Sequence, residues 1–82
     1  MYRITVIFFA TFRDKAGTSR AELKIPENTT IEGLRDILVI EFPGLESLAD
    51  HALASINKEV ALPGQIVPDG AEVAWFPPVG GG

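Results

Sequence analysis

Residues 2–9 alternate between two sets of side chains in the way that a β-strand requires. They are rich in aromatic and β-branched residues, which favour strands. Successive side chains of a strand point to opposite faces, so each face is predicted to carry one of two sets, Tyr2, Ile4, Val6 and Phe8 or Arg3, Thr5, Ile7 and Phe9. Residues 10–20 are predicted to be a connection, with room for a helical turn and a reversal at Gly17, and residues 21–25 a second strand.

The hydrophobic period changes in residues 29–44. Apolar side chains recur there at helical spacing, at Ile31, Leu34, Ile37, Leu38 and Phe42. Thr29, with Glu32 three residues later, fits a capping box, and Pro43-Gly44 predicts the end of the helix. A glycine inside the helix, Gly33, costs about 1 kcal/mol relative to alanine. We therefore expect the helix to persist by packing across one face of a sheet.

The rest of the chain predicts short strands separated by turns. Residues 45–52 are expected to form a short helical turn or a loop, and residues 53–62 to form two strands around a tight turn near Asn57-Lys58. After a loop that contains the turn Pro68-Asp69-Gly70, residues 71–76 are predicted to be the last strand.

This order of elements predicts an α+β fold. One main helix can cover only one face of a mixed sheet of four to five strands, and that arrangement is typical of a β-grasp, or ubiquitin-like, roll. We expect the β-grasp domain to span residues 1–77 and an extended, flexible glycine tail to span residues 78–82.

Apolar residues are left on the face of the predicted sheet that the helix does not cover. If the helix covers the face of Ile4, the opposite face carries Ile7, Phe9, Ala74 and Phe76. Scattered exposed apolar residues are ordinary in small domains, and covering loops are a second explanation. Gathered beside the last strand, these residues favour a protein–protein contact patch.

Composition and charge exclude several classes of protein. The 82 residues suffice for one domain, and the absence of cysteine excludes disulfides and thiolate metal sites. The amino-terminal segment is too short and interrupted for a transmembrane helix and lacks a signal-peptide cleavage site, so a cytoplasmic location away from membranes is expected. The net charge of −4 disfavours nucleic-acid binding and suits a partner with a basic surface.

The side chains offer no catalytic or metal-binding constellation. The single histidine, His51, has no nucleophile placed by any motif, no zinc-ligand spacing exists, and the carboxylates are dispersed at positions predicted to face solvent. We therefore expect no enzyme in this chain on its own, no metal site and no bound cofactor.

The segment 76–82, Phe-Pro-Pro-Val-Gly-Gly-Gly, provides a different kind of chemistry. Its prolines favour an extended path, and its glycines present no side chain, so the segment can thread a narrow channel in another protein. The carboxylate of Gly82 is ionised and a poor electrophile, but it can attack the α-phosphate of ATP to give an activated acyl-adenylate. A thiol or persulfide can then take the acyl group. A frayed end or a purification remnant is the alternative.

A β-grasp pattern that ends in two glycines resembles the ubiquitin-like sulfur carriers, and more narrowly the small subunit of molybdopterin synthase, the MoaD type. Residues 6–17, VIFFATFRDKAG, are similar to the family's strand followed by F-A-x-x-R-[ED]-x-x-G. Residues 69–82, DGAEVAWFPPVGGG, are similar to the family's D-G-D-E-V-A-F-F-P-P-V-x-G-G ending, and TIEGLRDIL fits its helix. Trp75 stands where phenylalanine is common, and Gly80 where serine, alanine or threonine is common.

The resemblance implies a function and two partners. A MoeB-type, E1-like enzyme would adenylate Gly82 with ATP and magnesium, and a sulfur-transfer system would convert it to a thiocarboxylate. The carrier would dock on a MoaE-type large subunit, typically in a heterotetramer, with its tail in that subunit's active site. There it would donate sulfur to cyclic pyranopterin monophosphate to form the molybdopterin dithiolene, in molybdenum cofactor biosynthesis.

The resemblance also implies site residues. Gly82 would carry the sulfur, the tail-threading residues would be Pro77, Pro78, Val79, Gly80 and Gly81, and the partner interface would include Phe9, Val60 and Phe76. Arg13 matches a family arginine near the activating-enzyme contact, and a solvated loop charge is the alternative.

Other functions stay open at this point. Carriers of the ThiS type, used in thiazole synthesis, or of tRNA thiolation share the chemistry, although ThiS-type chains are usually shorter and lack FPPV before the glycines. A ubiquitin-like interaction module with an inert tail and a covalent protein tag are the remaining alternatives.

Overall fold

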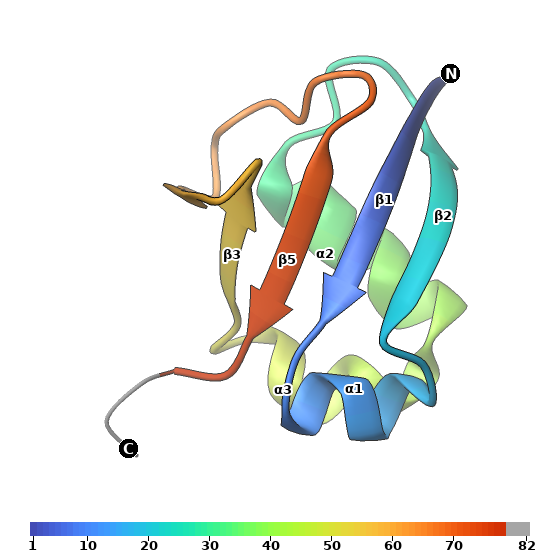
Figure 1. The fold of residues 1–82 in the computed structure, drawn as a ribbon, viewed down its shortest axis with the longest axis vertical. Coiled ribbons are helices and arrows are strands. Elements are labelled where there is room, and N and C mark those ends of the chain that lie inside the picture. The colour runs from blue at the N-terminus through green and yellow to red at the C-terminus, as the bar shows by residue number, and fades with distance from the viewer. Residues whose placement is uncertain (79–82) are drawn as a thin grey trace.

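A computed structural model describes residues 1–78 and shows a five-stranded mixed sheet with helices behind it (Figure 1). Along the chain the elements are β1 (Tyr2–Phe8), α1 (Thr11–Ala16), β2 (Arg20–Ile25), α2 (Ile31–Glu41), the 3-10 helix η1 (Pro43–Leu45), α3 (Glu46–Ala49), β3 (Leu53–Ile56), β4 (Glu59–Ala61) and β5 (Glu72–Phe76). The sheet order is β2-β1-β5-β3-β4, so the predicted mixed sheet with one main helix is observed.

The first and last strands lie side by side at the centre of the sheet. β1 pairs with β5 in parallel, with Val6 opposite Val73 and Phe8 opposite Trp75, whereas the other three pairings are antiparallel. The ladder continues one residue past β1, because the Phe9 N–H donates to the Trp75 carbonyl at 3.1 Å. Parallel strands finish at the same edge of a sheet, so the ends of β1 and β5 are neighbours.

The core lies between the sheet and α2, and its strand residues follow the predicted alternation. Ile4, Val6 and Phe8 are buried, whereas Arg3 on the other face is exposed. α2 contributes Ile31, Leu34 and Leu38 to the same core, and these positions match the predicted helical spacing.

The start of α2 corrects the predicted capping box at Thr29. The helix begins at Ile31, and the cap is Thr30, whose Oγ1 accepts a hydrogen bond from the Gly33 N–H at 3.1 Å. Thr29 instead donates its hydroxyl to the Pro26 carbonyl at 2.6 Å. Thr30 has the extended backbone that a cap requires, and its carbonyl accepts the first helical bond from Leu34. At the other end, Phe42 lies outside the helix and packs its ring edge-on against Phe8.

The connection after β1 holds more structure than a helical turn. Phe9 to Phe12 form a tight turn, in which the Phe12 N–H donates to the Phe9 carbonyl at 3.0 Å, and α1 begins within this turn at Thr11. Ala10 takes a positive φ of 51° in this turn, and Gly17 ends α1 at a φ of 78°. Phe12 is the buried anchor of α1 and joins the core, a role that its polar neighbours in the sequence hide.

The second half of the chain follows the predicted order closely. The segment expected to be a helical turn or loop contains η1 and α3, and the turn between β3 and β4 lies at the predicted Asn57-Lys58. Both turn residues have positive φ, 50° and 74°, which is the geometry of a type I′ hairpin turn.

Gly44 lets η1 approach the backbone of α1. A Cβ built at Gly44 would lie 2.5 Å from the Lys15 carbonyl oxygen, closer than any real Cβ contact. The contact between η1 and α1 therefore requires a residue without a side chain, and it holds α1 at the end of the sheet where β1 and β5 finish (Figure 1).

Substituting Gly44→Ala is expected to lower the free energy of unfolding by about 2 kcal/mol, because two backbones must separate to admit a methyl group. Gly64→Ala is the matched control: nothing lies within 4 Å of the position that its added methyl group would take, so its effect should stay within about 0.5 kcal/mol. Urea denaturation of the three proteins measures both values. Equal stabilities for the two variants would contradict the close approach.

Candidate docking surface and carboxyl-terminal segment

Cross-strand pairing gathers apolar side chains on the face of the sheet that α2 leaves open. Residues that pair directly across strands share a face. One row runs through Ile7, Ala74, Ser55 and Val60, and a second pairs Phe76 with Leu53. We call the apolar members of these rows, together with Phe9, the sheet patch: Ile7, Phe9, Leu53, Val60, Ala74 and Phe76.

Two aromatic rings form the end of the sheet patch nearest the end of β5. The ring centroids of Phe9 and Phe76 lie 5.7 Å apart with planes inclined by 38°. Phe9 is 48% exposed and Phe76 is half-buried. Both belong to the face predicted to point away from the helix, and each ring covers part of the other while leaving apolar surface in contact with water.

Val60 completes the sheet patch on the edge strand, where its side chain is 83% exposed. Leu53 adds a second aliphatic side chain, 42% exposed, which the sequence did not single out. Of the residues predicted to lie on the open face, only Ala74 is buried, since its methyl group sits between larger residues of the row.

An apolar groove of about 410 Å³ adjoins the sheet patch. Phe76, Leu53 and Val60 line it from the patch, and Leu62 and Pro63 extend it beyond β4. Leu62 is 66% exposed. The open face and the groove together form a continuous apolar surface, a property that marks protein–protein contact sites.

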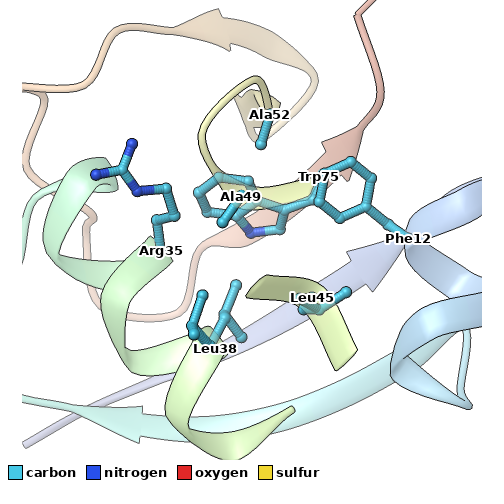
Figure 2. A pocket seen from close by; sticks show the side chains of 8 residues that line it. Phe12, Arg35, Leu38, Leu45, Ala49, Ala52 and Trp75 are labelled. Atoms are coloured by element: carbon cyan, nitrogen blue, oxygen red, sulfur yellow. The ribbon is translucent and has the colours of Figure 1, made fainter. Parts of the chain in front are cut away.

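Trp75 anchors the strand that carries Phe76. Figure 2 shows its indole packed between helical segments, with Phe12 of α1, Leu38 of α2 and Leu45 of η1 around it. The side chain is 2% exposed, and its Nε1–H has no hydrogen-bond partner among residues 1–78. The inward anchor holds β5 rigidly, so the outward Phe76 is presented from a fixed element.

Arg13, the fourth predicted interface residue, lies on α1 with its side chain 59% exposed. It pairs with the neighbouring Asp14, at 3.9 Å between Nε and Oδ1, and a pair this exposed contributes little to stability. The guanidinium is therefore available to a partner.

The predicted tail is described only at its start. Pro77 is half-buried and Pro78 is exposed, directly after the end of β5 at Phe76. The predicted threading residues Val79, Gly80 and Gly81 and the predicted sulfur-bearing Gly82 lie outside the described residues, so these assignments and the domain boundary at residue 77 stay predictions. The chain nevertheless leaves β5 beside the ring pair, because Pro77 follows Phe76.

Over the part of the chain that the structure describes, no three histidine, cysteine, aspartate or glutamate side chains group so that they could hold a metal ion. His51 is exposed. Nor does any helix among residues 1–78 have the length and apolar character needed to cross a membrane.

Comparisons with known proteins give consistent matches over nearly the whole chain. The model of the ThiS family matches residues 6–82. The molybdopterin synthase sulfur carrier subunit of Arabidopsis thaliana is 34% identical over 79 residues, which cover 96% of this chain and 82% of the relative.

Two solved structures share the fold. Small archaeal modifier protein 1 of Haloferax volcanii superimposes with a TM-score of 0.87 at 30% identity, covering 96% of this chain and all of the other. A protein–protein complex of subunits 1 and 2 of molybdopterin-converting factor from Helicobacter pylori contains a chain that superimposes with a TM-score of 0.68 at 22% identity, covering 98% of this chain and 99% of that one. The predicted β-grasp fold is confirmed.

The two rings of the sheet patch are expected to stabilise each other. In a double-mutant cycle, Phe9→Ala and Phe76→Ala should show a coupling of about 0.5–1 kcal/mol, because aromatic pairs add to simple burial. Urea unfolding followed by the fluorescence of Trp75, the single tryptophan, provides the four free energies. Additive effects would show that the rings are neighbours without attraction.

Proposed function

The chain belongs to the ThiS family, and we propose that it is a sulfur carrier, the small subunit of a molybdopterin synthase. The observation that carries this proposal is the extent of the family match, which runs through the glycines to residue 82. The relative from Arabidopsis thaliana, which bears the name molybdopterin synthase sulfur carrier subunit, supports the choice of pathway.

In this proposal the carboxylate of Gly82 is the group that changes. One of its oxygens attacks the α-phosphorus of magnesium-bound ATP and displaces pyrophosphate, which leaves an acyl-adenylate. A persulfide of a sulfur-transfer partner then attacks the acyl carbon and expels AMP. A thiol of that partner cleaves the resulting S–S bond, forming a disulfide and releasing the thiocarboxylate of Gly82.

The chain itself contributes no catalytic side chain in this scheme. A MoeB-type enzyme positions ATP, and a MoaE-type large subunit positions the pterin substrate, so the partners supply orientation and electrostatic stabilisation. The chain binds no metal or cofactor of its own, and the ATP and magnesium belong to the activating enzyme. We place the reactions in the cytoplasm, where ATP is available.

The sheet patch is the docking surface in this proposal. It lies where Pro77 leaves β5, so a partner that covers the rings of Phe9 and Phe76 is held next to the start of the tail. Residues 77–82 span at most about 20 Å when fully extended. The reacting site of each partner must therefore lie within that distance of its contact with the patch. The complex of subunits 1 and 2 from Helicobacter pylori supports a large-subunit partner.

A second function, covalent protein modification, is favoured by one specific observation. The similar structure from Haloferax volcanii is a small archaeal modifier protein, 30% identical to this chain. A modifier shares the adenylation of Gly82 but transfers the acyl group to an amine of another protein, so the two functions differ in the acceptor. ThiS-like carriers, tRNA-thiolation carriers and inert interaction modules remain as further alternatives.

The first test is the intact mass of the protein after incubation with a MoeB-type enzyme, ATP, magnesium and a sulfur source. We expect a shift that corresponds to one oxygen replaced by sulfur, and its absence in a variant that lacks Gly82. Conversion of cyclic pyranopterin monophosphate with the large subunit then assigns the pathway. A lysine-linked adduct instead of sulfur transfer would favour the modifier, and an unchanged mass, while a known carrier is modified in parallel, would refute the carrier proposal.

A charge introduced into the sheet patch is expected to weaken docking while the domain stays folded. Phe76→Asp should weaken binding to the large subunit by at least about thirtyfold, since a central aromatic contact contributes about 2 kcal/mol or more to such interfaces. Ile40→Asp is the matched control, because Ile40 is 77% exposed on α2, across the sheet from the patch. Calorimetric titration measures the affinities and circular dichroism the folding. If both variants bind like the parent, the sheet patch is not the docking surface.

A further inference from the structure

The segment 31–50 carries the whole net charge of the molecule. Residues 31–50, which include α2, η1 and α3, contain five carboxylates and a single cation, Arg35. Their net charge of −4 equals that of the complete chain, and the remaining residues hold six acidic and six basic side chains. The negative potential is therefore concentrated on one side of the domain.

This charge lines a groove of about 410 Å³ between α2 and α3, in which apolar and charged side chains alternate. Val39, Ile40 and Ala49 supply its apolar lining, and Ile40 is 77% exposed, the most exposed aliphatic side chain of the helices. Asp36, Glu46 and Asp50 line the same groove as carboxylates, and Arg35 lines it as the one cation.

The carboxylates of this groove are poorly compensated within the domain. Arg35 lies 3.8 Å from both Glu32 and Asp36, and within residues 1–78 no cation lies within ion-pair distance of Glu46 or Asp50. The last turn of α2 also carries Glu41 and no basic residue, although the carboxyl end of a helix favours cations. Glu46 suits the helix dipole in the first turn of α3, but Glu41 and Asp50 lie at the carboxyl ends of α2 and α3, where a negative charge is unfavourable. These two carboxylates therefore point to a use outside the domain.

We propose that the groove between α2 and α3 docks a basic amphipathic segment of a protein partner. One aliphatic or aromatic side chain of that segment packs on Val39 and Ile40, and flanking lysines or arginines pair with Asp36, Glu46 and Asp50. The same charge repels nucleic acids and anionic membranes. A second copy of this chain is a poorer match, because its remaining surface is balanced in charge.

The groove and the sheet patch lie on opposite sides of the sheet, since α2 crosses behind the strands whose outer face carries the patch (Figure 1). Both surfaces can be occupied at once. The inference goes beyond the proposed sulfur-carrier function and does not depend on it.

The test uses the full chain and a short synthetic helical peptide with one leucine flanked by lysines three and four residues away. Nuclear magnetic resonance titration should give shifts concentrated in residues 35–50, and the fluorescence of Trp75, which neighbours Arg35 and Ala49 in Figure 2, should respond. A peptide with glutamate in place of lysine should not bind.

Variants of the chain separate the contribution of the carboxylates to peptide binding from that of the apolar contact. Glu46→Lys with Asp50→Lys should weaken binding by at least about tenfold, because attraction becomes repulsion at the rim. Ile40→Ser should weaken it by about fivefold, since it removes an apolar contact without changing charge. Val60→Ser, which alters a similarly exposed aliphatic residue of the sheet patch, should leave the affinity unchanged.

Three results would overturn the proposal. The first is that Ile40→Ser and Val60→Ser both bind the peptide as tightly as the parent chain does. Binding would then be due to diffuse charge attraction and not to the groove. The second is a set of shifts centred on the sheet patch, or no binding at all. The third is concentration-dependent shifts of residues 35–50 without peptide, which would make the groove a contact between copies of the chain.

Discussion

The parallel pairing of β1 with β5 is the constraint on which the rest of the structure depends. It joins the two ends of the sequence at the centre of the sheet and makes both strands finish at the same edge. Without it, Phe9 and Phe76 would be distant, and Pro77 would leave the domain away from the aromatic pair. With it, one hydrogen bond from Phe9 to Trp75 holds the two outward rings in reach of each other. The exit of the chain from β5 at Pro77, beside an apolar surface, is thus a consequence of topology, and no local motif is required.

Local patterns were sufficient to predict the strands, the main helix and the open apolar face. Alternation across residues 2–9 separated Phe8 from Phe9, and both side chains lie as expected. Side-chain positions that depend on contacts between distant parts of the sequence could not be predicted from local patterns. The pairing of Leu53 with Phe76 needs the sheet order, and the burial of Phe12 needs the docking of α1 on that sheet. The capping error arose because two adjacent threonines both fit, and only the backbone geometry of Thr30 distinguishes them.

Trp75 and Gly44 show how the inner side of the domain supports the outer side. The indole occupies the space between the sheet and three helical segments (Figure 2). Its neighbour Phe76 points to the opposite face of β5. Gly44 lets η1 reach α1, which begins two residues after Phe9. The open face therefore rests on tightly packed elements, and a partner meets a surface whose shape is set before contact. Preorganisation of this kind reduces the entropy lost on association.

The limits of the open face follow from the size of the domain. One main helix covers one side of the sheet, so the other side must be polar or be covered by a partner. One part of the open face is polar, and another part is apolar and suited to a partner. At β2 the outward residues are Arg20, Glu22 and Lys24, all exposed, and nothing there needs a partner. From Ile7 across β5 to Val60 the outward residues become predominantly apolar. A partner footprint is therefore expected to end near β1, and the side of the sheet that it covers is the side from which the tail departs.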